Sequence, residues 1–199
     1  IFGVLSELRD TEFVWDGRRL NLLDATDVVS GVSGGSIIAT YYAVHGAEGL
    51  PRFEHDFLRQ DFQRSLVNLA LLPANMVELS SPWFGRTHLL ARQLDALYGG
   101  MTFGDLEKRP RQPQLLVTAT DLSRGTAFEF SWDQFLPICS NLRSMPLSFA
   151  VAASSAVPLL LSPVTLHNYA PQCPPPVDLV RPTRTAARDA NPANYRARM

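Results

Sequence analysis

Apolar and polar residues alternate along the first part of the chain with two different periods. Apolar residues at positions 1, 4, 5 and 8 follow the 3.6-residue period of a helix, which predicts a helix at the start of the sequence. Residues 22–30 end in a short β-branched run before Gly31, which predicts a buried strand followed by a sharp turn. Residues 35–45 are apolar nearly all round and precede Gly46, which predicts a buried helix with a glycine cap.

The same analysis predicts a further strand pair and several helices in the rest of the chain. Residues 50–100 carry apolar positions at helical spacing with proline and glycine interruptions, which predicts two or three helices over the sheet. Residues 114–120 predict a second buried strand, joined through the turn 123–125 to a strand over 126–132. Residues 146–156 are a small-residue helix or turn. Strands that alternate with helices indicate an α/β fold with a largely parallel sheet.

Composition excludes several classes of function. The chain has 199 residues, of which 46% are hydrophobic and 19% charged, and a net charge of −1, so no bulk positive field recruits nucleic acid. No stretch approaches the roughly 20 apolar residues that cross a bilayer.

The four histidines stand apart from cysteines and carboxylates at ligand spacing, so neither a metal nor a cofactor is expected. Cys139 and Cys173 either pair in an oxidising compartment or remain free thiols, and the compartment stays open.

The run Gly31-Val32-Ser33-Gly34-Gly35 places a serine where a strand turns into a helix. A serine hydroxyl becomes a nucleophile when it is exposed, oriented and relieved of its proton, and a tight strand-to-helix turn meets the first two needs. Gly31 and Gly35 stand two residues to either side of Ser33, where we expect a side chain to collide with backbone. Gly34 allows substrate to approach, and its N–H is expected to donate to a developing oxyanion.

Residues 31–35 resemble the nucleophile motif of the patatin-like phospholipase family, which often reads Gly-x-Ser-Gly-Gly. Three further segments look like family blocks in the same order, namely residues 102–106, 119–122 and 152–158. The resemblance implies a three-layer α/β/α fold with a mostly parallel central sheet. It also implies a lipid acyl hydrolase of the phospholipase A or lysophospholipase type, with Ser33 in a Ser–Asp dyad and no cofactor or metal. Lipid is then the expected partner.

Two parts of the family's active site have no counterpart in this sequence. The dyad aspartate of the family lies in an Asp-Gly-Gly or Asp-Gly-Ala motif, and none follows residue 158; the sole Asp-Gly, Asp16-Gly17, precedes Ser33. A glycine-rich oxyanion loop expected before Ile1 is also absent. We therefore expect residues 1–170 to be a partial acyl hydrolase domain, inactive alone. The Pro-rich and Arg-rich residues 171–199 are expected to lead toward its missing C-terminal part.

Other interpretations of the same residues remain open. Ser33, Asp121 and His167 follow the chain order of an α/β-hydrolase triad, although Asp121 is better explained as a cap of the turn that follows it. Ser154 and Ser155 either line an acyl pocket or are small residues in a close-packed helix. A non-catalytic lipid-binding fragment is a further alternative.

Two segments are candidates for peripheral contact with a membrane. Residues 82–84, Pro-Trp-Phe, and residues 69–72 are apolar, and core packing is the preferred explanation for the second. The tail 181–199 carries five arginines against one aspartate, which suits either anionic headgroups or a solvated surface.

Overall fold

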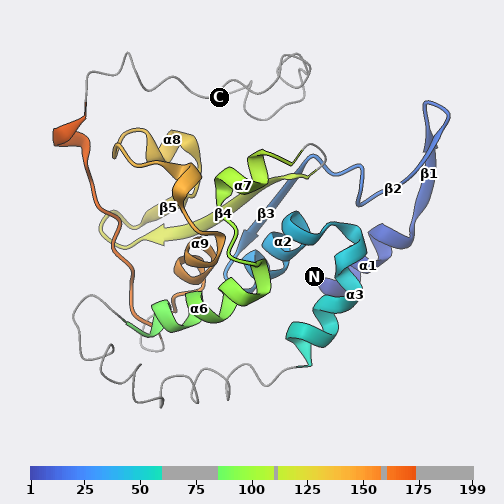
Figure 1. Cartoon of the computed structure of the whole chain (residues 1–199), viewed down its shortest axis with the longest axis horizontal. Helices are drawn as coiled ribbons and strands as arrows, with labels where there is room; N and C mark the ends of the chain where they lie inside the picture. The colour runs from blue at the N-terminus through green and yellow to red at the C-terminus, as the bar shows by residue number, and fades with distance from the viewer. Residues whose placement is uncertain (60–84, 110–111, 158–160, 174–199) are drawn as a thin grey trace.

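A computed structural model of the chain describes residues 1–59, 85–109, 112–157 and 161–173 (Figure 1). The first half comprises α1 (Phe2–Asp10), β1 (Glu12–Trp15), β2 (Arg18–Asn21), β3 (Val28–Val32), α2 (Gly34–His45), the 3₁₀ turn η1 (Ala47–Gly49), α3 (Leu50–Phe53) and the π-helical turn η2 (Glu54–Leu58). The second half comprises α6 (Arg86–Tyr98), α7 (Phe103–Glu107), β4 (Gln114–Asp121), β5 (Thr126–Glu129), α8 (Trp132–Phe135), η3 (Leu142–Ser144), α9 (Leu147–Ser154) and η4 (Ala170–Gln172).

Within the described residues, the central sheet has three strands in the order β3-β4-β5. β3 and β4 are parallel, with Gly31 opposite Val117, and β4 and β5 form the expected antiparallel hairpin. The strand predicted through residue 132 ends at Glu129, because Trp132 already begins α8. The α/β class is confirmed, with a sheet that is small and mixed.

Helix α2 packs on the parallel strands β3 and β4, α9 packs on β4, and α6 packs on α9. In Figure 1, α7 and α8 lie on the opposite side of β4 from α6 and α9. The core between these elements is closed, since Leu94, Val117, Phe135 and Leu147 have no exposed surface. The predicted all-round apolar helix is confirmed in α2, whose residues from Ser36 to Val44 are all buried. Because α2 starts directly after Ser33, this burial fixes the position of the turn.

Polar contacts connect these helices to one another. The Ser148 hydroxyl on α9 donates to Asp95 Oδ1 on α6 at 2.8 Å. The buried Tyr98 hydroxyl on α6 donates to the carbonyl of Ile37 on α2 at 3.2 Å. Burial also raises the pKa of Tyr98, so its hydroxyl stays protonated as a donor. α2, α6 and α9 therefore form one rigid support beside the sheet.

Helix α1 confirms the predicted helix at the start of the sequence, although none of its residues is fully buried. The helices expected over residues 50–100 are confirmed where the structure describes them, as α3 with η2 and as α6. The apolar segments at residues 69–72 and 82–84, and the arginine-rich tail 181–199, lie outside the described residues.

The hairpin β1–β2 is an element that the hydrophobic pattern did not predict. Asp16 and Gly17 form its turn with φ of 49° and 70°, and Trp15 pairs with Arg18 across it. Two positive φ angles in a two-residue turn are typical of type I′, for which Asp-Gly is a preferred sequence. The Asp16-Gly17 pair is thus the feature of the sequence from which this hairpin could have been predicted.

Candidate active site

Ser33 occupies the single residue between β3 and α2. Its backbone has φ 52° and ψ −131°, and it is one of three non-glycine residues with positive φ in the part of the chain that the structure describes. Such a conformation costs about 1–3 kcal/mol and persists only where the surroundings hold it. The predicted sharp strand-to-helix turn is therefore present, and Ser33 is its strained residue.

The glycines around Ser33 differ in what they permit. A Cβ on Gly31 would lie 2.5 Å from Ser36 Cα and 2.7 Å from the Gly35 carbonyl oxygen, so the expected backbone collision is confirmed there. The same expectation is wrong for Gly35, where a Cβ would meet only the side-chain end of Ile1 at 3.4 Å. A Cβ on Gly34 would meet nothing within 4 Å, which leaves open space beside that residue.

Hydrogen bonds hold both polar groups of the Ser33 backbone. The Ser33 carbonyl accepts from Ser36 N–H at 2.8 Å and from the Ser36 hydroxyl at 2.5 Å. The Ser33 N–H donates to Ser154 Oγ at 2.8 Å, and Ser154 Oγ donates in turn to the Thr118 carbonyl at 2.6 Å. Sequence reasoning treated Ser154 as a pocket or packing residue and missed this contact, because it joins residues 121 positions apart.

The first turn of α2 is suited to stabilise negative charge. Gly34 is the first helical residue and is exposed, so its N–H has no partner within the helix. The first turn carries no acidic side chain, and the twelve-residue helix directs the positive end of its dipole toward the turn. An oxyanion beside Ser33 would meet a favourable field at this place.

Asp121 serves the turn between β4 and β5. Its Oδ1 accepts from Ser123 N–H at 2.9 Å, from the Ser123 hydroxyl at 2.6 Å and from Arg124 N–H at 3.3 Å. The hydrogen bond from the Ser123 hydroxyl, with smaller contributions from the backbone, lowers the pKa of the Asp121 carboxyl. The predicted turn-capping role is confirmed.

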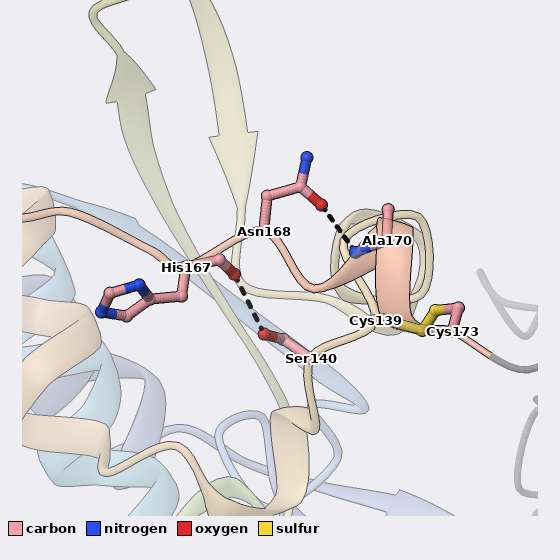
Figure 2. The surroundings of a disulfide bond; sticks show 6 residues. All are labelled: Cys139, Ser140, His167, Asn168, Ala170 and Cys173. Atoms are coloured by element: carbon pink, nitrogen blue, oxygen red, sulfur yellow. Dashed lines mark hydrogen bonds between the residues drawn. A yellow bond between two sulfur atoms is a disulfide. The ribbon is translucent and has the colours of Figure 1, made fainter.

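The third member of the alternative triad, His167, lies on an exposed segment (Figure 2). Its carbonyl accepts from the Ser140 hydroxyl at 3.5 Å, and its ring lies 5.9 Å from that of Tyr169, measured between centroids. Among the hydrogen bonds of the described residues, none joins His167 to Asp121 or to Ser33. The structure therefore does not assemble these three residues into a hydrogen-bonded triad.

Cys139 and Cys173, which the sequence left unassigned, form a disulfide with a Cα–Cα distance of 6.0 Å (Figure 2). Neighbouring hydrogen bonds support the same junction, since Tyr169 N–H donates to the Ile138 carbonyl at 2.9 Å. The disulfide attaches the segment that ends at η4 to the loop after α8. Disulfides of this kind persist in oxidising compartments.

In residues 1–59, 85–109, 112–157 and 161–173, no three histidine, cysteine or acidic side chains gather as metal ligands. No helix in them combines the length and hydropathy that crossing a bilayer requires.

The family model described as patatin-like phospholipase matches residues 2–178 of the chain. Neither the curated proteins nor the solved structures provide a match. The matched range contains the whole strand–Ser33–helix unit as well as Ser154 and the disulfide.

Proposed function

The chain belongs to the patatin-like phospholipase family, and we propose that Ser33 is the nucleophile of a lipid acyl hydrolase of the phospholipase A or lysophospholipase type. The observation that carries this proposal is the strained backbone of Ser33 between a parallel strand and the N-terminus of a buried helix. In such a turn the serine hydroxyl is exposed to substrate, and the N–H group of the next residue points toward the developing oxyanion.

In the proposed reaction, Ser33 Oγ attacks the carbonyl carbon of a lipid ester while its proton passes to a general base. The carbonyl π electrons move to oxygen, and the resulting oxyanion accepts a hydrogen bond from Gly34 N–H. When the tetrahedral intermediate collapses, the C–O bond to the alcohol breaks and the alcohol takes the proton from the base. Water then attacks the acyl-enzyme by the reverse sequence, which releases the fatty acid and restores Ser33.

The base in this proposal is an aspartate of the family's Asp-Gly-Gly or Asp-Gly-Ala motif. Residues 159–199 contain no such motif, and the Asp16-Gly17 pair forms the β1–β2 turn. The proposed dyad is therefore completed by an aspartate that is not among the 199 residues of this sequence. We likewise assign the further oxyanion donors to a glycine-rich loop that is not among these 199 residues.

The decisive experiment uses the full-length protein, a fluorophosphonate probe and a p-nitrophenyl fatty-acid ester. We expect the probe to modify Ser33, and Ser33→Ala to abolish both labelling and ester hydrolysis. Ser30→Ala is the matched control, because Ser30 is an exposed serine on the same strand, three residues earlier. A folded wild-type protein that neither reacts with the probe nor hydrolyses the ester would refute the proposal.

A second pair of variants distinguishes the dyad from the Ser-Asp-His alternative. His167→Ala should retain hydrolysis, because the His167 ring contacts Tyr169 and makes no hydrogen bond to Asp121 in the described structure. Loss of kcat in folded His167→Ala, equal to the loss in Ser33→Ala, would instead support the triad.

Because the family acts on lipids, we also propose that the protein contacts the surface of lipid aggregates peripherally. Sedimentation with phosphatidylglycerol-containing vesicles should recover the protein at low salt, and fatty acid should be released in the same sample. Vesicle binding without release of fatty acid would favour a non-catalytic lipid-binding role.

A further inference from the structure

We propose that Ser154 is a positioning residue, whose hydroxyl holds Ser33 in the backbone conformation that the reaction requires. The inference rests on the proposed function of Ser33 and deepens it. Ser154 is the last residue of α9 and is separated from Ser33 by 121 positions. Its side chain nevertheless contacts the backbone of the turn directly.

The two hydrogen bonds of Ser154 fix the direction of its hydroxyl. Its single proton points to the Thr118 carbonyl at 2.6 Å, so an oxygen lone pair faces the Ser33 N–H at 2.8 Å. Thr118 is the β4 residue paired with Val32, the residue immediately before the turn. The hydroxyl thus joins the end of β3, the middle of β4 and the end of α9.

This contact acts on the strained residue itself. Ser33 adopts φ 52°, a region that non-glycine residues leave unless neighbouring groups hold them there. Its carbonyl is held by Ser36, which lies in the first turn of α2. The N–H side is held by Ser154, which belongs to a different helix. Without Ser154 the peptide unit between Val32 and Ser33 would lose the acceptor that sets its orientation.

Ser154 is in turn supported independently of Ser33. Leu147, Ala150 and Val151 on α9 have no exposed surface. Ser148 binds Asp95 on α6, and the two helices pack along their lengths. Because packing fixes the position of Ser154, its hydroxyl holds the Ser33 N–H in a defined place.

The arrangement also separates the roles of two adjacent N–H groups. The Ser33 N–H is committed to Ser154, whereas the Gly34 N–H, at the open start of α2, is left for the oxyanion. Both hydrogen bonds of Ser154 Oγ are made to protein backbone groups and not to substrate. Removing this hydroxyl should therefore affect the chemical step more than substrate binding.

The test measures kcat and KM for the p-nitrophenyl ester with full-length variants. Ser154→Ala should lower kcat about tenfold to a hundredfold, because the part-buried Ser33 N–H loses its acceptor and the nucleophile shifts, and should change KM less than about twofold. Ser154→Thr retains a hydroxyl and should recover most of kcat. The matched control is Ser155→Ala: among the described residues the buried Ser155 Oγ has no hydrogen-bond partner, so kcat should stay at the wild-type value.

Amide hydrogen exchange of Ser33 provides a second readout that does not depend on turnover. The Ser33 N–H should be protected in the wild type and exchange faster in Ser154→Ala, while the amides of α9 keep their protection. Unchanged kcat in folded Ser154→Ala, or a rapidly exchanging Ser33 amide in the wild type, would overturn the inference. If Ser154→Ala fails to fold, the wild-type exchange and the Ser154→Thr kinetics decide.

Failure of this inference is distinguishable from failure of the proposed function. A wild type without labelling or hydrolysis refutes the role of Ser33 as nucleophile. An active wild type whose Ser154→Ala variant keeps full kcat refutes only the positioning role.

Discussion

Gly31→Ala is the substitution for which the structure gives the most direct physical expectation. The new methyl carbon would lie 2.5 Å from Ser36 Cα, 2.7 Å from Ser36 N and 2.7 Å from the Gly35 carbonyl oxygen. All three are backbone atoms of the first turn of α2, so no side chain can rotate away to make room. An ordinary contact of about 3.5 Å requires β3 and α2 to separate by about 1 Å.

The cost of that separation can be estimated from two effects. Forcing a methyl group into a packed site costs about 1–3 kcal/mol of the free energy of unfolding, and the buried face of α2 resists relaxation, so we expect about 3 kcal/mol. In a domain of this size such a loss lowers Tm by about 6–12 °C. A shift of about 1 Å at the nucleophile costs up to about a hundredfold in rate. Labelling of Ser33 by fluorophosphonate should therefore slow even below Tm.

Thermal and urea unfolding of Gly31→Ala and wild type measure the first effect, and the rate of fluorophosphonate labelling measures the second. Gly34→Ala is the control for stability alone, because its Cβ would meet nothing within 4 Å. It should unfold at or slightly above the wild-type midpoint, since alanine restricts the unfolded chain. A Gly31→Ala protein with wild-type Tm and labelling rate would refute the packing argument.

Two further predictions concern stability away from the turn. Reducing the Cys139–Cys173 disulfide, or replacing Cys139 with Ser, should lower the free energy of unfolding by about 3–4 kcal/mol in the loop-entropy model. Urea unfolding with and without reductant measures this loss. An unchanged unfolding midpoint would contradict the prediction. A hydrogen bond from Lys108, with others from the α7 cap, lowers the pKa of the Asp105 carboxyl from 3.8 to about 2. Its contribution is therefore complete above pH 3.8 and lost as pH falls toward 2, so the stability difference between wild type and Asp105→Asn should shrink over that interval.

Local patterns predicted the elements that local physics determines. The all-round apolar run after Gly35 gave α2, and the alternation around the turn 123–125 gave the β4–β5 hairpin. Asp121 was assigned to its turn from sequence because an aspartate two residues before a serine forms its hydrogen bonds within the same loop. The nucleophile candidate was found for the same reason, since strand, glycines and helix are contiguous.

Features that depend on tertiary contacts were not predictable in this way. Gly31 and Gly35 are equivalent in the motif, yet only Gly31 meets backbone, because α2 folds back over one side of the turn. Ser154 and Ser155 are likewise adjacent small residues in sequence. The direction in which α9 ends decides that Ser154 reaches Ser33 and that Ser155 does not.

The energetics of the turn explain why a single hydroxyl so far along the chain matters. The backbone conformation of Ser33 costs about 1–3 kcal/mol, and the three hydrogen bonds from Ser36 N–H, the Ser36 hydroxyl and Ser154 return about 0.5–1.5 kcal/mol each. The two sums are of similar size, so removing any one bond makes the relaxed conformation the favoured one. The core formed by α2, α6 and α9 does not depend on that choice. Variants of Ser154 and Ser36 should therefore lose reactivity at Ser33 while they still fold, because the strain is local and the packing that retains the fold is not.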